Sequence, residues 1–163
     1  MELEKLLKTL AIEAVLLDDL LALLERETVE LGNIDIAAMA ASNQAKEELI
    51  NKITEHAPSL QQAVSDCAVR EGLVATTALG ALAAHLAKRG SGELLSRQQQ
   101  VSNTADRIKQ AAAMNQEIAE RFAAMATTSL GLITRLINQS NVYGASGGYH
   151  QRPAGAVMIN REA

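Results

Sequence analysis

The sequence is poor in aromatic residues, cysteine and proline, and each scarcity excludes something. Aromatic side chains make up 2% of the 163 residues and tryptophan is absent. The core must therefore be aliphatic, and Ala, Leu and Met also favour helix. The single cysteine, Cys67, cannot form an intrachain disulfide, which fits a reducing compartment. Of two prolines, only Pro58 lies outside the last twenty residues, so long uninterrupted helices are allowed.

The chain also lacks an excess of positive charge and a long apolar run. Its net charge is -4, which argues against a nucleic-acid binder. The first residues lack the basic start of a signal peptide. The longest uncharged runs, residues 73–84 and 123–134, are too short to span a bilayer. We therefore expect a cytoplasmic protein that neither inserts into a membrane nor binds nucleic acid.

A leucine heptad dominates the first thirty residues. Steps of four and three along residues 3–31 meet eight apolar residues in nine positions, and the ninth is Thr28. Four such repeats predict a long helix with coiled-coil-like packing over residues 2–31. Its length would be about 45 Å, more than a compact small domain requires.

A short turn should follow, and a second helix should fold back antiparallel. Gly32 provides a helix stop, and Asn33 or Asp35 can cap the next helix. Pro58 lacks a backbone donor, so we expect this helix to kink or restart there. Residues 58–71 remain helical in pattern, and Gly72 can interrupt the chain before the apolar residues 73–89. The expected packing seam of the second helix contains Ile36, Met39, Asn43, Lys46, Ile50 and Ile53.

The last helix should run over residues 93–140, after a turn at residues 90–92. Its seam reads Val101, Thr104, Ile108, Ala111, Asn115, Ile118, Phe122, Met125, Ser129, Leu132 and Leu136. The sequence thus predicts an all-α protein, an elongated antiparallel four-helix bundle over residues 1–140. Residues 141–163 are rich in Gly and small polar residues and are expected to form a flexible tail.

The sequence offers little that could carry catalysis or bind a cofactor. None of the three histidines has a carboxylate or another histidine at metal-binding helical spacing, and Cys67 lies on an apolar stripe without a neighbouring base. One alternative remains: His85 with Lys88 resembles the phosphoacceptor stretch of histidine phosphotransfer domains. However, Arg89 occupies the position where those domains carry glycine. We expect no metal, no cofactor and no enzyme activity.

The end of the last helix is unusually free of charge. Between Phe122 and Arg152 the only lysine, arginine or acidic residue is Arg135. Two aliphatic stripes lie side by side and cover an arc of about 140°, wider than one coiled-coil seam needs. This arc could be buried in the bundle, or one stripe could receive an amphipathic helix of a partner. The stripes are formed by Met125, Leu132 and Leu136, and by Leu130, Ile133 and Ile137.

Several segments, taken in order, resemble the FlgN family of flagellar export chaperones, and the resemblance covers nearly the whole chain. The matching segments are residues 17–27 (LDDLLALLERE), 31–35 (LGNID), 46–49 (KEEL), 114–116 (MNQ) and 142–147 (VYGASG). The family often shows a second asparagine, followed by glycine, after the first, where this chain has Glu117 and Ile118. A polar Asn115 on a packing seam would then serve to fix the register of the helices.

The resemblance implies a non-enzymatic chaperone that keeps the hook–filament junction proteins FlgK and FlgL soluble and delivers them to the export gate component FlhA. By analogy, clients would bind the end of the last helix through Leu130, Ile133, Leu136 and Ile137, and Tyr143 would dock on the gate. A helical adaptor without client preference is a further hypothesis. The long helices could also pair between two copies, so a homodimer stays open.

Overall fold

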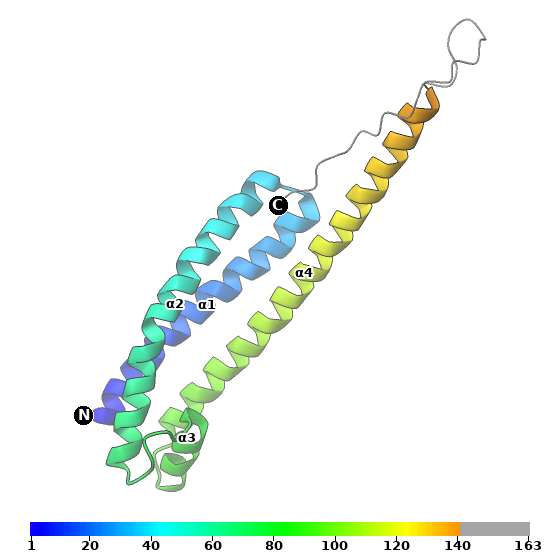
Figure 1. Ribbon diagram of the computed structural model, residues 1–163. Coiled ribbons are helices and arrows are strands. Elements are labelled where there is room, and N and C mark those ends of the chain that lie inside the picture. Colours follow the sequence, from blue (N-terminus) through cyan, green and yellow to red (C-terminus); the bar gives the residue numbers. More distant parts are fainter. Residues whose placement is uncertain (141–163) are drawn as a thin grey trace, which may run out of the picture. The chain divides into compact units, whose positions relative to one another are not determined.

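The computed structural model describes the backbone of residues 1–140 and the side chains of residues 1–136, and this part of the chain is all-α as predicted (Figure 1). Its helices are α1 (Glu2–Asn33), α2 (Ile36–Arg70), α3 (Leu79–Lys88) and α4 (Glu93–Ser140). The chain divides into two compact units, Met1–Ala119 and Glu120–Ala163, and α4 contributes to both. The predicted tail, residues 141–163, lies outside the described residues.

Helices α1 and α2 form an antiparallel hairpin (Figure 1). Side-chain contacts show the direction, because each contact partner moves back along α2 as the chain moves forward along α1. Glu13 contacts His56, whereas Glu27 contacts Lys46. The hairpin has the constant register that a long heptad requires.

The turn between α1 and α2 has a left-handed residue that is not glycine. Gly32 lies inside α1, and the left-handed position falls on Ile34, with φ 56° and ψ 39°. The amides of Ile34 and Asp35 donate to Leu31 O and Glu30 O, the Schellman pattern. Asp35 then caps α2 by accepting a hydrogen bond from the Ala38 amide at 3.0 Å, as predicted. The stop predicted at Gly32 is thus wrong by two residues.

Helix α2 continues through Pro58, so the predicted restart was wrong. The predicted seam was also partly out of phase, because Ile36, Asn43 and Ile50 are exposed. The seam that is buried or half-buried repeats in steps of three and four across Pro58, so packing supports the helix on both sides of the proline. It consists of Met39, Ser42, Lys46, Leu49, Ile53, His56, Leu60, Ala63 and Cys67.

Helix α3 closes an aliphatic core at one end of the first unit. The α2 helix stops before Gly72, which has a φ of 76°, and the amide of Leu73 bonds back to Ala68 O. The core cluster combines Leu6 and Leu10 of α1, Ala63, Cys67 and Ala68 of α2, Leu82, Ala83 and Leu86 of α3, and Leu94 of α4. Burial raises the pKa of the Cys67 thiol, and the charges of Glu71 and Glu2 add to this effect. Cys67 is therefore a small core residue rather than a reactive thiol.

The first part of α4 runs parallel to α1. Thr104 donates to Asp18 at 3.1 Å, and further along both helices Asn115 contacts Leu24 and Thr28. The seam predicted for α4 is buried or half-buried from Val101 to Phe122. Because α1 and α2 are antiparallel, this part of α4 also runs antiparallel to α2. The long helices α1, α2 and α4 therefore differ from the simple antiparallel order expected for four helices.

A polar network joins α1, α2 and α4 at the other end of the first unit. Asn115 is 5% exposed, and its Nδ2 donates to Leu24 O at 2.9 Å and to Glu27 Oε2 at 2.8 Å. Its Oδ1 accepts a hydrogen bond from the Thr28 hydroxyl at 2.6 Å. The other oxygen of Glu27 receives the Lys46 ammonium of α2. Both hydrogen-bonding ends of the asparagine are thus satisfied, and only one alignment of the three helices achieves this.

The left-handed Ile34 predicts a stabilising substitution. Ile34→Gly should raise the free energy of unfolding by about 1 kcal/mol, because a β-branched residue is strained at positive φ and glycine is not. The Ile34 side chain is 62% exposed, so little burial is lost. Chemical denaturation measures the change. Ile36→Gly is the matched control: Ile36 is 75% exposed but helical, and its replacement should lower stability. Equal effects of both substitutions would contradict the strain argument.

The polar network predicts a costly change at Asn115. Asn115→Ala should lower the free energy of unfolding by about 2–3 kcal/mol, since it removes bonds to a carbonyl and a carboxylate that stay buried. Urea denaturation followed by circular dichroism measures this. Asn103→Ala, at an exposed position of the same helix, should change stability by less than about 0.5 kcal/mol. A loss at Asn115 no larger than that at Asn103 would show that the network does not contribute.

Candidate functional site

The strongest candidate surface is the part of α4 that follows Phe122. Every side chain of residues 123–136 is exposed. We call the large aliphatic residues among them the aliphatic strip: Met125, Leu130, Leu132, Ile133 and Leu136, with exposed fractions between 52% and 65%. One helix thus changes from a narrow buried seam to a fully exposed surface within one turn.

The polar residues between these aliphatic side chains turn back onto their own helix. The hydroxyl of Thr127 donates to Ala123 O at 2.9 Å, that of Thr128 to Ala124 O at 3.0 Å, and that of Thr134 to Leu130 O at 2.9 Å. The donor of each threonine is therefore used locally, and its methyl group adds to the apolar surface. Arg135 is the only charged residue of this segment. A contiguous exposed apolar surface of this kind is typical of sites that bind a partner.

The predicted site residues fall into three groups. Leu130, Ile133 and Leu136 are exposed on the aliphatic strip. Ile137 belongs to α4, but its side chain is not among those described. Tyr143 lies outside the described residues. Helical spacing brings Leu130 and Ile133 to one side of α4.

The phosphotransfer alternative depends on His85, whose Nε2 atom is buried. His85 lies in the last turn of α3, and its Nε2 is closed to solvent and has no hydrogen-bond partner. Arg89, at the position where phosphotransfer domains have glycine, follows the end of α3 and pairs with Glu71 at 2.7 Å. A receiver domain needs an exposed ring nitrogen and a small neighbour. Nε2 of His85 is not exposed, and its neighbour Arg89 is a large residue.

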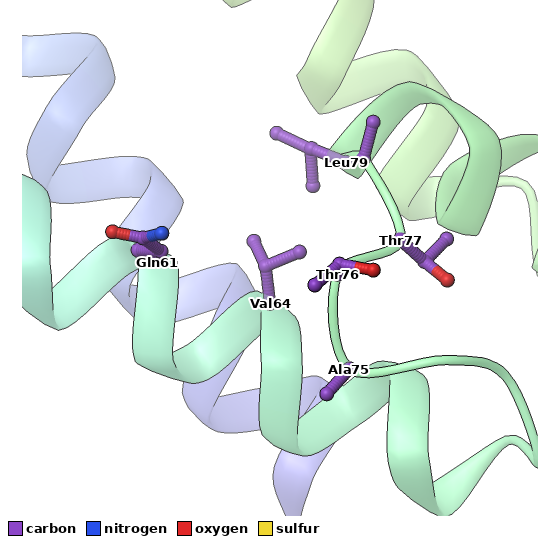
Figure 2. A pocket seen from close by; sticks show the side chains of 7 residues that line it. Gln61, Val64, Ala75, Thr76, Thr77 and Leu79 are labelled. Atoms are coloured by element: carbon purple, nitrogen blue, oxygen red, sulfur yellow. The ribbon is translucent and has the colours of Figure 1, made fainter.

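The first unit has hollows between its elements. One, of about 280 Å³, lies between α2 and the segment before α3, where Figure 2 shows Val64 and Leu79 on opposite sides. Its lining residues are Gln61, Val64, Ala75, Thr76, Thr77, Ala78 and Leu79. None of them titrates, so this hollow offers no acid or base. Within the described residues, no group of three metal-ligating side chains comes together.

Sequence reasoning missed the polar pairs between α1 and α2. His56 Nδ1 lies 2.9 Å from Glu13 Oε2, and both side chains are largely buried. Arg26 Nη2 donates to the buried Ser42 hydroxyl at 3.3 Å. Shifting the α2 seam by one position would have placed Ser42 and His56 on the buried face. These pairs connect α1 with α2 and have a structural role. The aliphatic strip remains the candidate site.

None of the four helices, over their described residues, is long and apolar enough to cross a bilayer. No curated protein and no solved structure matches the chain. The family model described as FlgN protein matches residues 1–151. That match covers most of the sequence, including all four helices and the aliphatic strip. The chain therefore belongs to the FlgN family of flagellar chaperones.

Proposed function

We propose that this protein is a cytoplasmic, non-enzymatic export chaperone that binds the junction proteins FlgK and FlgL and delivers them to the flagellar type III export apparatus. The observation that carries the proposal is the aliphatic strip of α4, exposed along residues 123–136 with a single charge. Family membership supplies the biological setting.

The strip has dimensions suited to a visiting helix. Fourteen helical residues extend about 20 Å, which matches three to four turns of an amphipathic helix. Covering one half-exposed aliphatic side chain contributes about 1 kcal/mol. A handful of such contacts supports moderate affinity once the loss of freedom on binding is subtracted. Moderate affinity suits a chaperone that must later release its client.

In this proposal, Leu130, Ile133, Leu136 and Ile137 contact the client, and Tyr143 docks on the export gate component FlhA. Terminal segments of the clients that are amphipathic helices would otherwise self-associate. Covering their apolar face keeps them soluble, because binding shifts the equilibrium away from free, aggregation-prone chains. No cofactor is required for this action.

The client contact is tested by charging the strip. Ile133→Asp combined with Leu136→Asp should weaken binding of FlgK by about 30-fold or more, since two apolar contacts with the client become buried carboxylates. Isothermal titration calorimetry with purified FlgK measures the dissociation constant. Val74→Asp is the matched control, because Val74 is 71% exposed outside the helices. An unchanged dissociation constant in the double variant would place the client elsewhere.

The gate contact is tested at the tyrosine. Tyr143→Ala should weaken binding to the cytoplasmic part of FlhA by at least about tenfold, because aromatic anchors dominate small interfaces. The same variant should bind FlgK like the unaltered chain. Surface plasmon resonance with both partners separates the two effects. If Tyr143→Ala weakened binding to FlgK and to FlhA equally, the two partners would not have separate sites.

A further inference from the structure

A short apolar segment lies in the sequence beyond α4. Residues 156–159 read Ala-Val-Met-Ile, and only this stretch after Ser140 has three consecutive aliphatic residues larger than alanine. The nearest charged residues on either side are Arg152 and Arg161, so the segment itself is uncharged. The match to the family model ends at residue 151, and this segment is therefore a feature of the chain that the match does not include. We call it the apolar run.

The apolar run lies within reach of the aliphatic strip of α4. Fifteen residues, 141–155, connect the end of α4 to the run. The rise of an α-helix places the strip about 6–22 Å before Ser140 along the helix axis. Four of the fifteen connecting residues are glycine, and a glycine-rich chain of this length has an average end-to-end distance of about 20 Å. The connection thus matches the distance that it has to span.

The spacing of side chains in the run also suits the strip. Four residues are too few for a helix that is stable by itself, so the extended form is the one to compare. In an extended chain Val157 and Ile159 point to the same side, about 7 Å apart. Leu132 and Leu136 lie one turn apart on α4, a separation of about 6 Å along the axis. Two side chains of the run can therefore contact two side chains of the strip at once.

The charge of the strip does not oppose such a contact. Arg135 is exposed and forms no ion pair or hydrogen bond with another described residue. Its guanidinium can stay in water at the edge of an uncharged segment, whereas it would repel a basic one. The threonine hydroxyls beside it already donate to their own helix, so covering them leaves no donor without a partner.

Attachment to the same chain makes a weak contact effective. A contact of two side chains has by itself a dissociation constant of about a millimolar or weaker. A separate peptide of this composition would therefore bind only at a very high concentration. A connection whose length matches the span gives an effective concentration in about the millimolar range, so the strip would be covered in about half to nine tenths of the molecules. This favours the run of the same chain over a separate partner.

We propose that the apolar run folds back onto the aliphatic strip of its own α4 and covers it until a client displaces it. Covering the strip protects an exposed apolar surface from unspecific association. It also lowers the affinity for a client by the fraction of molecules whose strip is free. The competition with a client rests on the proposed function, whereas the contact between run and strip does not.

The contact is tested without a client, by paramagnetic relaxation in the full chain. Ala163→Cys provides the attachment point for a nitroxide label, and Cys67→Ala removes the native thiol. The label should broaden the methyl signals of Leu130 and Ile133, because the contact holds the end of the chain beside the strip. Val157→Asp combined with Ile159→Asp should remove most of this broadening, since two carboxylates cannot be buried on an apolar surface. Circular dichroism confirms that each variant is folded.

The competition is tested with the client. Val157→Asp combined with Ile159→Asp should tighten binding of FlgK about two- to tenfold, because the strip is then free in every molecule. Ala145→Asp combined with Ala154→Asp is the matched control. It adds the same charge beyond α4 but outside the run, and it should leave the dissociation constant unchanged. Isothermal titration calorimetry with purified FlgK measures both variants.

Three results would overturn the proposal. One is broadening that is the same with and without the two aspartates in the run. Another is broadening that appears only between copies when spin-labelled and isotope-labelled chains are mixed, which would assign the contact to a second chain. The third is FlgK binding that depends on Ile133 and Leu136 but is not tightened by the aspartates. Broadening in a chain whose FlgK binding ignores the strip would support the contact and contradict only the proposed client site.

Discussion

The structure depends on polar side chains that lie within the helical seams and must find partners there. A leucine heptad can slide by a turn at little cost, because every layer of leucines resembles the next. Asn115, Glu27 and Lys46 remove this freedom, since their bonds connect α4, α1 and α2 in a single alignment. The aliphatic core around Leu6 and Leu82 supplies cohesion at the other end. Cohesion and register are thus provided by different parts of the same bundle.

Much of this fold could be predicted from periodicity, and the errors have physical causes. The ends of α2 and α3 followed from Gly72 and Gly90, and the start of α2 followed from the Asp35 cap, whereas the stop at Gly32 did not hold. The α2 seam was misphased because hydrophobicity was used to find it, whereas its buried face carries Ser42 and His56, whose partners lie far away in the sequence. Pro58 was treated as a local break, but packing on both sides of it outweighs the lost backbone bond. The left-handed Ile34 could not be predicted, because local preference would place glycine there.

The candidate site was predictable for a different reason. A long uncharged stretch after Phe122 is visible in the sequence alone, and helical spacing gathers its aliphatic residues. Whether these residues would be buried in the bundle could not be decided from their pattern, because a core and a docking surface use the same residues. The structure exposes the described part of that stretch.

The threonines of the aliphatic strip have a consequence for selectivity. The hydroxyls of Thr127, Thr128 and Thr134 donate to carbonyl oxygens of their own helix. The strip therefore offers few hydrogen-bond donors to a ligand. Shape and apolarity alone then decide what is accepted, and apolar surfaces discriminate weakly between similar sequences. In the proposed function, a surface of this kind would accept unrelated cargoes in turn, with no fixed order among them.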